Sequence, residues 1–183
     1  MDSKSQYSCL GFFEIVLDFF EKLKKAHDGV PYKPDHMKFD VNIRLNDIYA
    51  FFIFCFHMKD WIKNDDLVSA KAKSEVEDFV GNTPCLRVCA DIANGMKHYK
   101  LDRQRSTTRP KFTLAKRSII SDKVLDGTKP DSPEHSAAIV KDLNFLKTDS
   151  GEVEVFDLAS ECVNKWKEFI EKNIYKEQAK QNP

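Results

Sequence analysis

The sequence has no Cys-x-x-Cys pair, no net charge and no apolar run long enough to cross a bilayer. Its five cysteines are scattered and odd in number, so neither a disulfide framework nor a zinc cage is expected. The 29 basic and 29 acidic residues cancel, which leaves no overall field to attract nucleic acid or anionic lipid. A membrane-spanning helix needs about 20 apolar residues, and a signal peptide needs a basic and then an apolar stretch. We therefore expect a soluble, cytoplasmic protein with reduced core thiols and no membrane partner.

Several catalytic signatures are also missing from the chain. It has no glycine-rich phosphate loop, no serine-hydrolase elbow and no zinc-finger spacing. We therefore expect no cofactor, and any contact with nucleic acid must come from a local basic patch.

Helical periodicity dominates what the sequence does contain. Five segments are predicted to be helical, namely residues 8–26, 41–63, 68–79, 84–101 and 157–175. The second segment is apolar on nearly all sides and should form the centre of the core, whereas the alternating charges of the third predict an exposed helix. Thr83 and Pro84 suit the N-cap and the first residue of the fourth helix.

Before the last helix the hydrophobic period falls from 3.6 towards two. Three segments alternate apolar and polar residues or favour β-branched ones, namely residues 111–120, 138–146 and 152–156. Asp149, Ser150 and Gly151 suit a hairpin turn between the last two. We predict a mainly α single domain, residues 1–183, in which a bundle of four or five helices (8–101 and 157–175) holds a small antiparallel β-sheet. This sheet is inserted at about residues 109–156, before the C-terminal helix.

The most informative stretch of the sequence ends at His98. A carboxylate, an amide and an imidazole, those of Asp91, Asn94 and His98, fall within about 60° of one another on a helix. Arg87 shares this face, and the apolar stripe of the same helix points roughly the opposite way. One interpretation is a solvated surface. The other is an acid-base group at an interface, to which Lys97 adds a second cation.

A second polar group, His57 and Asp60, lies within the most apolar helix. A buried imidazole needs hydrogen-bond partners, so one interpretation is a polar seam that fixes packing against the helix at residues 84–101. The other is a site on two helices, and any metal bound there would have His57, Asp60, Asp91 and His98 as ligands. The Glu-x-x-His repeat of metal-binding bundles is missing, and we predict no metal.

A basic segment follows the polar face directly. Residues 102–117 contain one acidic residue, Asp102, and the cations expected to contact RNA phosphates are Arg103, Arg105, Arg109 and Lys111. The alternative is a charge-rich connector that only solvates a hairpin.

A helical core with Asn94-x-x-x-His98 near the end of a late helix resembles the HEPN superfamily, found in prokaryotic toxin-antitoxin and antiviral defence systems. The signature of that family is an arginine, commonly followed by a polar residue, with a histidine four to six positions after the arginine. Asn94 and His98 match the polar and histidine positions, Ala93 stands where the arginine is expected, and Arg87 is the nearest arginine on this face.

This resemblance implies a metal-independent endoribonuclease that acts as a homodimer, in which the motif helices of two protomers form a shared cleft. His98 would be the acid-base group, Asn94 its orienting neighbour, and Arg87 or Lys97 the phosphate contact, with Asp91 on the same face. The partners would be RNA, and an antitoxin or another defence-system protein. Two alternatives stay open: a non-enzymatic helical interaction protein whose polar seam only specifies packing or assembly, and a helical-bundle metal-binding protein.

Overall fold

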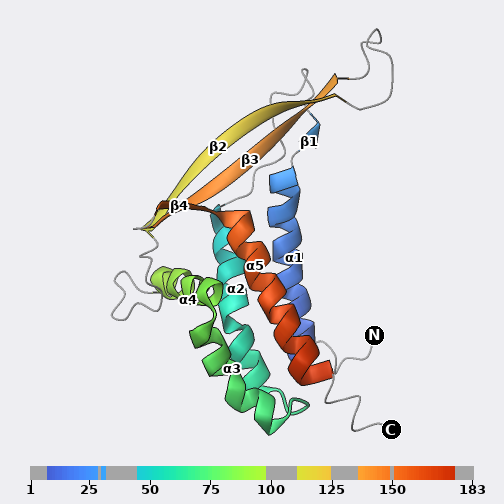
Figure 1. Cartoon of the computed structure of the whole chain (residues 1–183), viewed down its shortest axis with the longest axis vertical. Coiled ribbons are helices and arrows are strands. Elements are labelled where there is room, and N and C mark those ends of the chain that lie inside the picture. Colours follow the sequence, from blue (N-terminus) through green and yellow to red (C-terminus); the bar gives the residue numbers. More distant parts are fainter. Residues whose placement is uncertain are drawn as a thin grey trace.

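The computed structural model in Figure 1 describes residues 8–28, 30–31, 45–97, 111–124, 136–148 and 151–175. Its helices are α1 (Cys9–Asp28), α2 (Leu45–Asn64), α3 (Ala70–Asn82), α4 (Pro84–Lys97) and α5 (Val155–Ile170), the last extended by a π-helical turn, Glu171–Tyr175. The strands are β1 (Val30–Pro31), β2 (Lys111–Val124), β3 (Ser136–Thr148) and β4 (Gly151–Glu154). The mainly helical fold, with an antiparallel hairpin before the C-terminal helix, is confirmed. None of the helices in these ranges is both long and apolar enough to cross a membrane.

Helix α2 lies at the centre of the bundle, as its apolar sequence predicts. It packs against α1, α3, α4 and α5, so most of its surface is removed from water. Its side chains that point into the core are almost completely buried, namely Ile48, Phe51, Phe52, Cys55, Met58 and Ile62.

Aromatic rings attach α1 to α2. The Phe12 ring stacks on the Trp61 ring with centroids 4.5 Å apart, and Phe19 stacks on Phe54 at 5.2 Å. The N-terminus of α1 is held against the residue that follows α2, because the Cys9 amide donates a hydrogen bond to an Asp65 carboxylate oxygen at 2.7 Å. Stacked pairs of this kind add to the free energy gained from burying the rings.

Helix α5 closes the core against α2 and α4. The Glu154 carboxylate accepts from the Asp157 amide at 2.9 Å and caps the helix, which therefore begins at Val155, within the segment predicted as a strand. The buried Trp166 indole donates to the Cys55 carbonyl oxygen at 3.1 Å. Its ring also contacts Phe79 and Phe169. This residue therefore connects α5, α2 and α3.

The β insertion is built on β3. Strand β2 pairs antiparallel with β3 along almost its full length, whereas β1 and β4 pair with opposite ends of the other edge of β3. Strands β3 and β4 pair antiparallel on either side of the predicted turn, of which Gly151 alone is described; it has a φ of 128°, a conformation that favours glycine. The hairpin arches over one end of the helices (Figure 1), where β3 contacts α1 and α5.

Two local expectations differ from the structure. Helix α3 is not an exposed helix, because Ala72, Val76 and Val80 form a buried row at intervals of four residues. Pro84 does begin α4, but the Thr83 hydroxyl donates back to the Phe79 carbonyl at 2.7 Å and so completes the end of α3. The threonine thus satisfies an orphan carbonyl of one helix instead of an orphan amide of the next.

We expect Trp166→Phe to lower the free energy of unfolding by about 1 to 3 kcal/mol, because it removes a buried donor and leaves a gap. Trp61→Phe is the matched control, since a phenyl ring keeps the stack on Phe12. Urea unfolding followed by circular dichroism measures both. Equal losses of unfolding free energy in the two variants would contradict a larger contribution of Trp166 to stability.

Candidate functional site

The structure describes the side chains of five of the predicted site residues, namely His57, Asp60, Arg87, Asp91 and Asn94. For Lys97 and Lys111 it describes the position in a helix or strand alone. The remaining predicted positions, His98, Arg103, Arg105 and Arg109, lie outside the described residues.

The polar face of α4 is more enclosed than its helical wheel predicts. Arg87, Asp91 and Asn94 fall within about 60° of one another, as expected. However, Asp91 is 0% exposed, so the interpretation of a solvated face is wrong for this residue. Its side chain also has an interaction partner, as a buried carboxyl group requires. Asn94 and Arg87 are partly exposed, whereas the Asp91 carboxyl group on the same face of α4 is buried.

Arg87 is the exception to the rule that buried polar atoms are paired. In the described structure its Nε is buried and has no hydrogen-bond partner. Such a donor costs free energy unless a further group satisfies it. A guanidinium group is also the side chain best suited to bind phosphate through two parallel hydrogen bonds.

On α2, His57 and Asp60 form a pair with each other. His57 Nδ1 lies 2.9 Å from Asp60 Oδ2, and their side chains are 39% and 43% exposed. The expectation of a buried seam against α4 is therefore wrong. Burial raises the pKa of Asp60, but the His57 hydrogen bond and the charge of Lys59 outweigh it, so the pKa lies below its usual 3.8.

The polar groups of α2 and α4 lie on opposite sides of the contact between these helices. The Cys89 thiol donates to the Phe52 carbonyl oxygen at 3.3 Å, which identifies the two facing surfaces. His57 is rotated by about 200° from Cys55 around the axis of α2, and Asp91 is rotated by about 200° from Cys89 around the axis of α4. Both polar residues therefore point away from the cysteine-bearing sides of their helices. His57, Asp60 and Asp91 are accordingly not gathered into a set of metal ligands in the described part of the chain.

An ion-pair group joins α2 to α3, which the sequence analysis did not identify. Glu77 Oε1 lies 2.9 Å from the Lys59 ammonium and 3.0 Å from that of Lys63. Burial raises the pKa of Glu77, but the hydrogen bonds and charges of the two lysines lower it by more. The pKa of Glu77 therefore lies below its usual 4.5. These ion pairs hold α2 and α3 together, so they form a structural contact.

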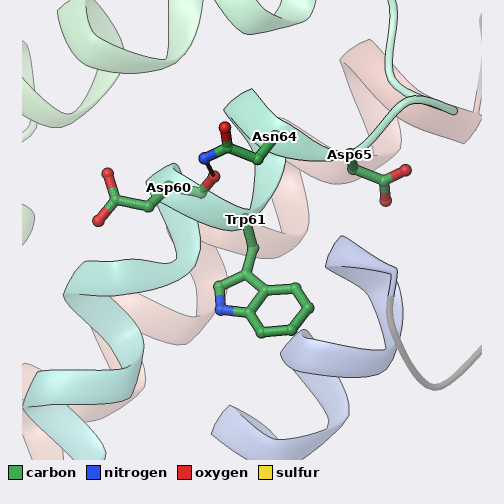
Figure 2. Close-up of a pocket in the computed structure, with 4 residues that line it drawn as sticks. All are labelled: Asp60, Trp61, Asn64 and Asp65. Atoms are coloured by element: carbon green, nitrogen blue, oxygen red, sulfur yellow. Dashed lines mark hydrogen bonds between the residues drawn. The ribbon is translucent and has the colours of Figure 1, made fainter.

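A pocket of about 260 Å³ lies at the C-terminal end of α2 and is lined by Asp60, Trp61, Asn64 and Asp65. Figure 2 shows that the carboxylates of Asp60 and Asp65 point in opposite directions, and that Trp61 points toward α1. Asn64 donates to the Asp60 carbonyl at 2.8 Å, while Asp65 accepts the amides of Cys9 and Leu67. The polar groups are engaged locally and do not converge on a ligand.

Sulfur atoms form the tightest cluster of reactive groups. Cys55, Cys89 and Cys162 are fully buried, and their Sγ atoms lie within 4.8 Å of one another. All five cysteines are free and buried, which confirms the expectation of core thiols. Burial raises the pKa of Cys89 and Cys162 well above 9.0.

Comparisons of the chain with protein-family models, with curated proteins and with solved structures found no match. Function therefore has to be inferred from the side chains and from the resemblance carried by Asn94 and His98. The described geometry offers two separate groups for this purpose, the Arg87 face of α4 and the thiols on its other face.

We expect His57→Ala to raise the pKa of Asp60 toward 3.8, because the main favourable hydrogen bond is lost. A folded-state pKa below the unfolded one stabilises the protein at neutral pH, and this contribution is lost as the pH falls through the folded pKa. The variant should therefore lose less stability on acidification than the original protein. An NMR titration of the carboxyl carbon gives the pKa directly.

His27→Ala is the matched control for this measurement. His27 lies 3.4 Å from the carboxylate of Asp28 on α1, so its removal should leave the titration of Asp60 unchanged. An Asp60 pKa that stays the same in His57→Ala would show that the pair does not form in solution.

Proposed function

We propose that this chain is an RNA-directed protein of HEPN-like type that cleaves RNA without a metal ion. The observation that supports the proposal best is the partly exposed Arg87 on the same face of α4 as the partly exposed Asn94, with a guanidinium group whose buried Nε has no hydrogen-bond partner in the described structure. Helix α4 is described as far as Lys97, and His98 follows it in the sequence. The face would thus combine a phosphate-binding cation, an amide and an imidazole.

The proposed chemistry divides the work among these residues. The 2′-hydroxyl of the ribose attacks the adjacent phosphorus, and the bond to the 5′-oxygen of the next nucleotide breaks. The 2′-hydroxyl loses a proton and the leaving 5′-oxygen gains one; His98 carries out one of these two transfers and water the other. Arg87 or Lys97 offsets the charge that develops on the phosphate, and Asn94 orients the imidazole. The products are a 2′,3′-cyclic phosphate and a 5′-hydroxyl.

In the proposal, Asp91 is not a proton carrier. It is fully buried and partnered, whereas Asn94 is partly exposed. In the proposal, Asp91 holds the position of the helix and the accessible residues around it contact RNA. The cations Arg103, Arg105, Arg109 and Lys111 would bind the backbone on either side of the cleaved bond.

A homodimer would complete this site. The partly exposed Asn94 and Arg87 of two chains can face each other across a twofold axis, so that one RNA strand lies between two histidines. An antitoxin or another defence-system protein that covers this face would then block access to it. Both statements follow from the resemblance and belong to the proposal.

We expect the purified protein to cleave single-stranded RNA in the presence of a chelator, and His98→Ala to reduce the rate by about 10²- to 10⁴-fold, the usual contribution of a general acid or base. His57→Ala is the control with the same loss of an imidazole. It should retain full activity, because His57 lies on the other side of the α2–α4 contact. Product ends and rates are measured on a labelled oligonucleotide.

Thermal melting of both variants shows that each is folded. Cleavage that survives in His98→Ala would exclude this residue as the catalytic group. A dimeric, folded protein without any cleavage would favour the alternative of a non-enzymatic interaction protein.

A further inference from the structure

Three of the five cysteines come together where α2, α4 and α5 meet. Cys55 belongs to α2, Cys89 to α4 and Cys162 to α5, and their Sγ atoms lie within 4.8 Å of one another. Cys85 lies one turn before Cys89 on α4 and is also buried, next to this group of three. Sulfur atoms from three helices thus surround one point of the core.

We propose that Cys55, Cys89 and Cys162, with Cys85 as the fourth ligand, bind one thiophilic metal ion, Zn²⁺ or Cu⁺. The described residues offer no carboxylate or imidazole in this group, so the donor set is purely sulfur. Thiolates of this kind select zinc and monovalent copper over the hard cations magnesium and calcium.

The spacing of the sulfur atoms fits such an ion. A Zn–S bond is about 2.3 Å long, which places the sulfur atoms of a tetrahedral site about 3.8 Å apart. The three sulfur atoms already lie within 4.8 Å of one another, so rotations of the side chains are sufficient to reach this arrangement. The backbones of three packed helices do not need to move.

Metal binding requires these neutral thiols to become thiolates, and the charge of the metal ion offsets the cost of that change. A thiolate in an apolar core has a large desolvation cost unless a cation offsets it. When the metal binds, each ligand thiol loses its proton to solvent and a metal–sulfur bond replaces the S–H bond. The Cys89 thiol then gives up its hydrogen bond to the Phe52 carbonyl oxygen, a small loss against a metal–thiolate bond.

The complete burial of these sulfur atoms predicts how the metal would enter. Cys55, Cys89 and Cys162 are 0% exposed, so a folded chain has no open path to them. The ion would bind while the helices assemble, and its binding free energy would add to the free energy of folding. This site does not depend on the proposed ribonuclease activity, since Cys89 and Arg87 lie on opposite faces of α4.

The test is to refold the full chain anaerobically with a non-chelating reductant and one equivalent of Zn²⁺, Cu⁺ or Co²⁺. We expect one ion per chain after gel filtration, measured by mass spectrometry of the metal, and a Tm several degrees above that of the metal-free protein. Co²⁺ should give the intense visible and sulfur-to-metal charge-transfer bands of a tetrahedral thiolate site. Retention of Zn²⁺ or of Cu⁺ alone identifies which ion the site prefers.

Variants then locate the ligands. Cys162→Ala and Cys89→Ala should weaken metal binding more than about tenfold, since losing even an outer-shell partner costs about 10- to 100-fold. Cys9→Ala is the matched control, because Cys9 is equally buried but lies on α1, outside the cluster. It should keep one ion per chain.

Circular dichroism establishes that each variant folds, and the Co²⁺ spectrum of the unmodified chain requires no variant at all. The proposal is overturned if the refolded chain retains none of the three ions. It is also overturned if Cys162→Ala and Cys89→Ala fold and retain as much metal as Cys9→Ala does.

Discussion

Every other helix of this protein depends on the burial of α2. Its buried side chains contact α1, α3, α4 and α5, so the free energy gained from removing this helix from water is shared among all four interfaces. An element enclosed in this way leaves little room for polar side chains. Those it does carry, such as Lys59, His57 and Asp60, are paired.

The same constraint explains which parts of the fold could be predicted from sequence. The all-round apolar pattern of α2 and the alternating pattern of β2 and β3 are local signals, and all three elements were predicted. The buried row of α3 was missed because small residues, Ala72, Val76 and Val80, lie among charges and give little contrast. The start of α5 was misplaced because the Glu154 cap depends on a side-chain hydrogen bond that periodicity does not report.

The candidate site was less predictable, for a reason visible at Asp91. A helical wheel shows that Asp91, Asn94 and Arg87 share a face, but it does not show how many neighbours enclose that face. Helix α4 is packed on more than its apolar stripe, so Asp91 is buried beside the partly exposed Asn94. The cysteine cluster was missed for the complementary reason. Its members are far apart in the sequence, and only the crossing of three helices brings Cys55 and Cys162 together with Cys89.

Helix α4 links the two proposals physically. Cys85 and Cys89 lie on its inner face at an interval of one turn, and Arg87 lies between them in sequence on the opposite face. A metal ion bound by both cysteines would fix the rotation of α4 about its own axis, because two ligands on one helix leave that rotation no freedom. The direction in which Arg87 and Asn94 point would then be fixed as well. The inner thiols would determine the geometry of the outer face without any contact with RNA.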